Sequence, residues 1–157
     1  MVPPVAIYLV RHGHAGDRSD WPGDDLRRPL STKGRRQADH LAALLDDRPV
    51  KAIFSSPAVR CLETVAPLAV RLGLPAQEAI ELIEGADADA AIRFALEHAD
   101  DDPVLCSHGD LIPQMLRRLV TAGMRGDIGS ECRKGSMWML ELDGDDVVKG
   151  TYRAPHD

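Results

Sequence analysis

Aromatic residues are scarce in this sequence, at 4% of 157 residues, and there are only three cysteines. A core with so few aromatic rings has to be built from Leu, Val, Ile and Ala. Cys61, Cys106 and Cys132 are an odd number of cysteines at unrelated spacings, a pattern that argues against a disulfide framework or a zinc knuckle. We therefore expect a reduced, cytoplasmic chain without a structural metal.

Excess basic charge and long apolar runs are also missing. The net charge is −6, whereas nucleic-acid binders carry a basic surface and anionic lipid attracts one. The first apolar run, residues 5–10, is too short to cross a bilayer. Met1-Val2-Pro3-Pro4 has no basic segment of the kind that begins a signal peptide. The sequence therefore predicts no nucleic-acid partner, no membrane association and no signal peptide.

Strand patterns and helix patterns alternate along the chain. Buried strands are expected at 5–10, 51–54 and 103–107, a weaker strand at 79–82, and a closing pair at 136–142 and 147–152. Helices are expected from 31 or 32, from 57, over 87–98 and after 109. Pro67 should kink or end the second helix near Ala66. This order predicts one domain over residues 1–157, a three-layer α/β/α sandwich with a mostly parallel central sheet.

Polar groups follow three of the expected strands. Arg11-His12-Gly13 follows the first strand, Ser55-Ser56-Pro57 with Arg60 follows the second, and Ser107-His108-Gly109 follows the strand at 103–107. Ligands bind outside the carboxyl ends of strands in such sheets. If these strands are neighbours, two arginines and two histidines converge and need an anionic partner. The arginine fork matches a phosphoryl group, although a sulfuryl group fits equally well.

These motifs resemble the signature of the histidine phosphatase superfamily, whose best-known members are the phosphoglycerate mutases. The resemblance rests on four segments in order: Leu9-Val10-Arg11-His12-Gly13, Pro29 to Ala38, Ser55 to Thr64, and Ser107-His108-Gly109. The short chain and Arg28-Pro29-Leu30 are similar to the SixA branch of phosphohistidine phosphatases. Gly23-Asp24-Asp25 and Arg133-Lys134-Gly135-Ser136 are similar to the phosphatase-like domain fused to Nudix hydrolases.

The resemblance implies a role for individual residues. His12 would attack phosphorus and carry the phosphoryl group, while Arg11, Arg60 and His108 would hold its oxygens. Glu84, in Leu82-Ile83-Glu84, is the first candidate for proton donor, and Glu81 is the second. The candidates for further substrate contacts are Gly13, Arg18 and Arg28. Independently of the resemblance, the attacking His12 has to be neutral, and His108 donates best when it is protonated.

The reaction expected is metal-independent, cofactor-free hydrolysis of a phosphoester or phosphohistidine through a phosphohistidine on His12. The partner would be a phosphorylated small molecule or a phosphohistidine protein. A nucleoside di- or monophosphate phosphatase is the alternative. A mutase is disfavoured because the chain has little room for a lid over the intermediate, and a non-catalytic phospho-ligand module remains a further alternative.

His12-x-His14 has a spacing that can bind metal, but no recognised spacing links it to further ligands. The substrate and the oligomeric state stay open.

Overall fold

The computed structural model describes residues 4–126 and 131–156. The signal-peptide prediction rests mainly on Met1, Val2 and Pro3, which lie outside these residues. Six strands form one sheet: β1 (Ala6–Arg11), β2 (Ile53–Ser55), β3 (Ala76–Glu78), β4 (Val104–Ser107), β5 (Met137–Asp143) and β6 (Asp146–Arg153). The helices are α1 (Thr32–Leu45), α2 (Val59–Leu72), α3 (Ala88–Glu97) and α4 (Leu111–Thr121). The 3₁₀ turns are η1 (Arg18–Asp20), η2 (Asp25–Arg27), η3 (Ile80–Leu82) and η4 (Ala99–Asp101).

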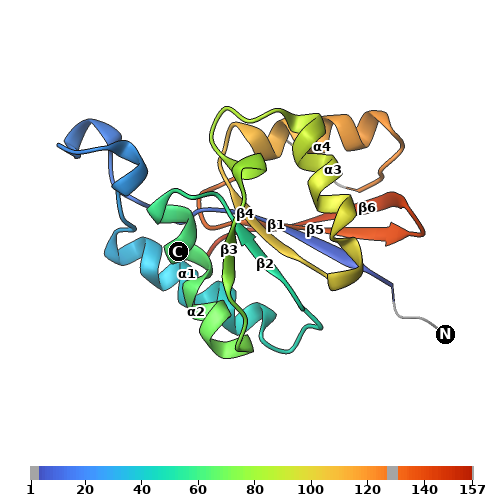
Figure 1. Ribbon diagram of the computed structural model, residues 1–157, viewed down its shortest axis with the longest axis horizontal. Coiled ribbons are helices and arrows are strands. Elements are labelled where there is room, and N and C mark those ends of the chain that lie inside the picture. The colour runs from blue at the N-terminus through green and yellow to red at the C-terminus, as the bar shows by residue number, and fades with distance from the viewer. Residues whose placement is uncertain (1–3, 127–130, 157) are drawn as a thin grey trace.

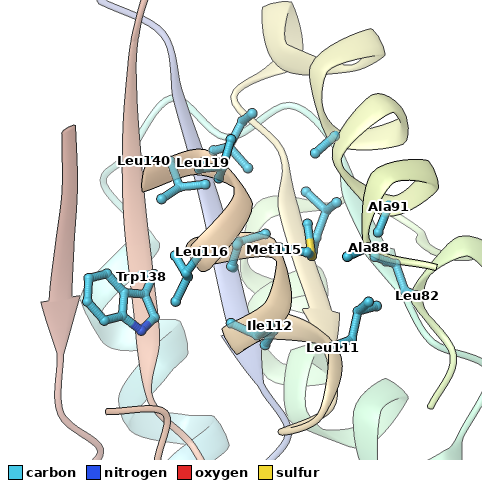
Figure 2. Packing of buried hydrophobic residues seen from close by; sticks show 14 of the residues in the cluster. Leu82, Ala88, Ala91, Leu111, Ile112, Met115, Leu116, Leu119, Trp138 and Leu140 are labelled. Carbon is cyan, nitrogen blue, oxygen red and sulfur yellow. The ribbon is translucent and has the colours of Figure 1, made fainter. Parts of the chain in front are cut away.

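The sheet lies between two layers of helices (Figure 1). Alternate residues of β1 face opposite sides: Ile7 and Leu9 pack with α3 and α4, whereas Tyr8 and Val10 pack with α1 and α2. Figure 2 shows the first of these interfaces, where α4 packs its apolar side on the sheet beside Trp138. The predicted three-layer sandwich is therefore confirmed.

The strand order is β3-β2-β4-β1-β5-β6. The pairs β2–β3, β2–β4 and β1–β4 are parallel, and β1–β5 and β5–β6 are antiparallel. The sheet is thus mostly parallel, as predicted, with an antiparallel closing hairpin. Gly144, with φ +61°, lies in the turn between β5 and β6. Such a turn favours glycine because it has no Cβ.

One local prediction was wrong, and another was wrong in one of its two alternatives, since α2 does not end near Ala66. Helix α2 begins at Val59 and continues through Pro67 to Leu72. Cys61, Val65 and Leu68 are fully buried on one face of it, and this packing outweighs the one helical hydrogen bond that proline removes. The expected strand at 79–82 is the 3₁₀ turn η3. The strand found in this region is β3, which precedes η3. It is an edge strand, and its sequence lacks the apolar run that predicts a buried strand.

No helix in the described part of the chain is long and apolar enough to span a membrane.

Candidate active site

The three predicted strand ends lie side by side. Strand β4 pairs with β1 on one side and β2 on the other, and the register places Ser107 opposite Arg11 and Ser55 opposite Cys106. A cavity of about 620 Å³ opens at this edge of the sheet. Its lining residues are Arg11, His12, His14, Gly16, Asp17, Arg18, Arg28, Arg60, Glu84, His108, Gly109, Asp110 and Lys134. The structure therefore brings together the predicted residues Arg11, His12, Arg60 and His108, which we call the inner cluster.

His12 is held in one tautomer. Its Nδ1 lies 2.8 Å from the carbonyl oxygen of Gly13, and because a carbonyl only accepts, Nδ1 carries the proton and Nε2 keeps its lone pair. The ring is only 5% exposed. Burial lowers the pKa of His12 to about 3, and the hydrogen bond to Gly13 only partly offsets this. The charges of Arg60 and Arg11 act in the same direction as burial, so His12 is neutral at physiological pH.

Arg11 and Arg60 present unused donors. Arg11 donates from Nη1 to the carbonyl of Cys132 at 2.6 Å, and Arg60 donates from Nη1 to the carbonyl of Asp25 at 2.9 Å. The Nε atoms of both guanidinium groups are buried, and neither has a hydrogen-bond partner among the described residues. Buried N–H groups without a partner are rare in proteins. Both arginines line the cavity, and two guanidinium groups with unpartnered N–H groups there indicate an anion-binding site.

His108 lies beside His12, with the ring centroids 5.4 Å apart and the planes at 66°. Its Nδ1 is 3.5 Å from Arg60 Nη2 and its Nε2 is 2.8 Å from Ser56 Oγ. Since arginine only donates, Nδ1 accepts and Nε2 carries the proton. These contacts describe a neutral ring. The protonated donor form of His108 therefore stays a prediction.

Two glycines allow close packing around the cluster. A Cβ on Gly109 would lie 2.5 Å from Arg11 Cζ, so only glycine leaves room for that guanidinium. Gly13 is a candidate substrate contact that the structure does not place on the cavity lining. Its amide donates to Thr64 Oγ1 at 2.9 Å, and a Cβ there would lie 3.1 Å from the Gly34 carbonyl oxygen. Gly13 therefore packs between α1 and α2, behind His12.

Asp25 joins three arginines, a role that the sequence analysis missed. Its Oδ1 accepts a hydrogen bond from Arg28 Nε at 3.0 Å and forms a salt bridge with Arg18 Nε at 3.1 Å, and its Oδ2 forms a salt bridge with Arg60 Nη2 at 3.2 Å. Burial alone would raise the pKa of Asp25. The hydrogen bond from Arg28 and the charges of Arg60, Arg18 and Arg28 outweigh burial and lower the pKa below its ordinary value. The carboxylate therefore stays ionised and neutralises part of the arginine charge.

Glu84 lies on the cavity lining, and Glu81 does not. Both carboxylate oxygens of Glu84 accept from Arg18 Nη2, at 2.9 and 3.1 Å. Asp110 lies beside it and accepts from the Gly85 amide at 2.8 Å. The structure thus favours Glu84 over Glu81 by position, but it pairs Glu84 with a cation.

The predicted substrate contacts Arg18 and Arg28 both lie on the cavity lining. Arg28 is 7% exposed and also donates from Nη1 to the carbonyl of Ala15 at 2.7 Å. Lys134 lines the same cavity, and no role for it was predicted. The signal that could have found Lys134 was its place in the Arg133-Lys134-Gly135-Ser136 motif. For Asp25, the signal was the need of clustered arginines for a fixed counter-charge. Among the residues that the structure describes, no three His, Cys, Asp or Glu side chains are grouped as metal ligands.

An α/β/α sheet with a neutral histidine among arginines at its carboxyl edge is suited to bind and attack a tetrahedral anionic group. The family model of the histidine phosphatase superfamily (branch 1) matches residues 7–87. The chain belongs to this superfamily, so the predicted resemblance and the predicted enzyme class, a phosphatase, are both confirmed at the level of the family.

The comparisons with individual proteins agree with this family. The 8-oxo-(d)GTP phosphatase of Mycolicibacterium smegmatis is 35% identical over 161 residues, which cover 99% of this chain and 50% of that protein. The chain thus spans about half the length of this curated relative.

Solved structures share the fold. A SixA structure from Nakamurella multipartitia has a TM-score of 0.76 at 21% identity, covering 99% of both chains. The protein histidine phosphatase SixA complexed with tungstate has a TM-score of 0.74 at 19% identity, covering 97% of this chain and 96% of that one.

Proposed function

We propose that this chain is a metal-independent phosphatase that hydrolyses a phosphoester or a phosphohistidine through a covalent phosphohistidine on His12. One observation carries the proposal: a neutral imidazole with its Nε2 lone pair free lies beside two buried guanidinium Nε–H donors that have no partner among the described residues. Both arginines line the cavity with His12, so a tetrahedral dianion next to Nε2 would meet two guanidinium groups.

The first step forms the bond from Nε2 to phosphorus and breaks the bond from phosphorus to the leaving group. The ring gains positive charge in this step, and the hydrogen bond from Nδ1 to the Gly13 carbonyl stabilises that charge. Arg11 and Arg60 balance the charge on the phosphoryl oxygens. Both arginines are already in place before reaction, so little reorganisation is needed.

Glu84 is the proton donor in this proposal. Its proton goes to the leaving-group oxygen or nitrogen, and the resulting carboxylate then takes a proton from the attacking water. Water bonds to phosphorus, the bond to Nε2 breaks, and inorganic phosphate leaves. Because both oxygens of Glu84 accept from Arg18 Nη2, part of this contact has to break before Glu84 can reach the leaving group.

Trapping the intermediate tests the mechanism. The protein is incubated with a ³²P-labelled phosphate donor and quenched in alkali, in which phosphohistidine survives. We expect label on the wild type and on the matched control His40→Ala, since His40 is exposed and stacks on His156. His12→Ala should lose the label and about 10³-fold or more in turnover. Wild-type turnover by His12→Ala would overturn the mechanism.

A nucleotide is the second candidate substrate. The relative from M. smegmatis, similar over nearly the whole chain, carries the name of an 8-oxo-(d)GTP phosphatase. The cavity volume also lies within the range of about 300–1,000 Å³ typical of small-molecule sites. Turnover of nucleoside di- and monophosphates is compared with that of a phosphohistidine protein, with chelator present. Hydrolysis of the protein alone would remove this candidate.

A further inference from the structure

Lys134 is a cation of the cavity that, like Arg11, has no carboxylate partner among the described residues. It comes from the segment before β5, is half-buried and lines the cavity. Within residues 4–126 and 131–156, no side chain or carbonyl makes a hydrogen bond or a salt bridge with its ammonium group. Arg18 and Arg28, by contrast, are both paired with Asp25. The network around Asp25 therefore leaves Lys134 out.

The surroundings of Lys134 are positive. Burial lowers the pKa of Lys134, and the charges of Arg11 and Arg28 lower it further, with only Asp17 acting in the opposite direction. Holding a partly buried ammonium among guanidinium groups costs free energy unless an anion is bound there. Asp17 supplies part of that negative charge from a distance, but it makes no salt bridge with Lys134, and its Oδ1 accepts from the amide and hydroxyl of Ser19.

The inner cluster does not need Lys134 for a single phosphoryl group. Arg11 and Arg60 offer two guanidinium groups next to His12 for one phosphoryl group, and Asp25 balances part of the charge of Arg60. A cavity of about 620 Å³ is far larger than one such group. Lys134 and the inner cluster thus offer positive charge for two anionic groups of one ligand.

We propose that Lys134 binds a second phosphate of the substrate, one that is linked directly to the phosphoryl group that His12 receives. Two features favour a diphosphate over a more distant anion. Lys134 lies close enough to Arg11 for their charges to interact, and adjacent phosphates are held by adjacent cations. Lysine also binds phosphate as a compact point charge. This inference rests on the proposed function and narrows its substrate class to diphosphates, such as a nucleoside diphosphate.

Calorimetric binding of two inert probes tests the site without turnover. Methylenediphosphonate has two phosphorus groups and methylphosphonate has one. The wild type should bind the first roughly 10- to 100-fold more tightly. Lys134→Met should remove most of this difference, and Lys134→Arg should keep much of it. The control is Lys51→Met, because Lys51 is exposed and lies outside the cavity, and its preference should equal that of the wild type.

The outcomes separate this inference from the proposed function. If the wild type binds both probes equally, or if Lys134→Met keeps the full preference, the second phosphate site is wrong while the phosphatase proposal stands. If the wild type binds neither probe, the phosphoryl site itself is wrong. Phosphonoacetate, in which a carboxylate replaces the second phosphorus group, identifies the anion. If phosphonoacetate binds as tightly as methylenediphosphonate, the assignment of the substrate class to diphosphates is wrong.

Discussion

The inner cluster and the rim of the cavity are built in different ways. His12, Arg60 and His108 are 5%, 1% and 1% exposed. His12 and His108 directly follow β1 and β4, and Arg60 lies in the first turn of α2, so the fold places them. On the rim, Arg18 and Glu84 have side chains that are 59% and 45% exposed, and salt bridges between loops place them.

The backbone positions the inner cluster, whereas salt bridges between charged side chains position the rim. The backbone of His12 is held on two sides: its amide donates to the Ser107 carbonyl at 3.1 Å, and its carbonyl accepts from the Gly135 amide at 3.0 Å. The rim depends on Asp25, whose side chain is 30% exposed. We therefore expect changes in the inner cluster to reduce the chemical step and changes on the rim to affect substrate binding.

Replacing Arg60 should have the larger effect. Arg60→Met removes a buried donor next to His12 and should lower kcat by roughly 10²- to 10³-fold, as for other donors to a transition-state charge. The matched control is Arg71→Met on the same helix α2, where Arg71 pairs with Asp46 at 3.0 Å on the surface. Exposed pairs contribute at most about 1 kcal/mol to stability, so this control should keep its activity. Equal kcat values for the two variants would show that Arg60 does not act on the reaction.

Replacing Asp25 should have a smaller and different effect. Asp25→Asn weakens three arginine contacts at once and frees Arg18 and Arg28 to reorient. We expect KM to rise about 10-fold, from the loss of charge-assisted hydrogen bonds, with a smaller change in kcat. Steady-state kinetics measure the two separately. Asp24→Asn is the control, because asparagine also caps a helix and can keep the hydrogen bond from the Leu26 amide. A loss confined to kcat would contradict the assignment of Asp25 to the rim.

The same contrast explains how much of the site the sequence could predict. Residues 9–13 and 107–109 end parallel strands, and the carboxyl ends of neighbouring parallel strands share one edge of the sheet. The meeting of His12 with Arg11, Arg60 and His108 could therefore be predicted from strand patterns, motifs and charge. Most of the helices and strands followed from periodicity and capping residues in the same way.

The rim could not be predicted in this way. Asp25, Arg18 and Glu84 meet because the 14–30 loop folds towards the turn after η3, and no periodicity encodes that approach. Short-range signals also failed where packing outweighs them, as at Pro67 in α2. Gly13 showed a further limit: a motif identifies a residue but does not say whether its amide faces a ligand or, as here, Thr64.

The smallest expected effect is a loss of stability at acid pH, and it concerns His12 of the inner cluster alone. Because the pKa of His12 is lowered from 6.5 to about 3, the unfolded chain binds more protons than the folded chain between these values. The contribution of His12 to stability is therefore present above pH 6.5 and is lost as the pH falls towards 3, by about 2 kcal/mol at pH 5.

Thermal unfolding of wild type and His12→Asn is compared at pH 7.5, 6 and 5. The Tm of the wild type should fall by a few degrees more than that of the variant. The other histidines are common to both proteins and cancel in this comparison. Parallel Tm curves would mean that His12 titrates normally, and the neutral nucleophile would then need another explanation.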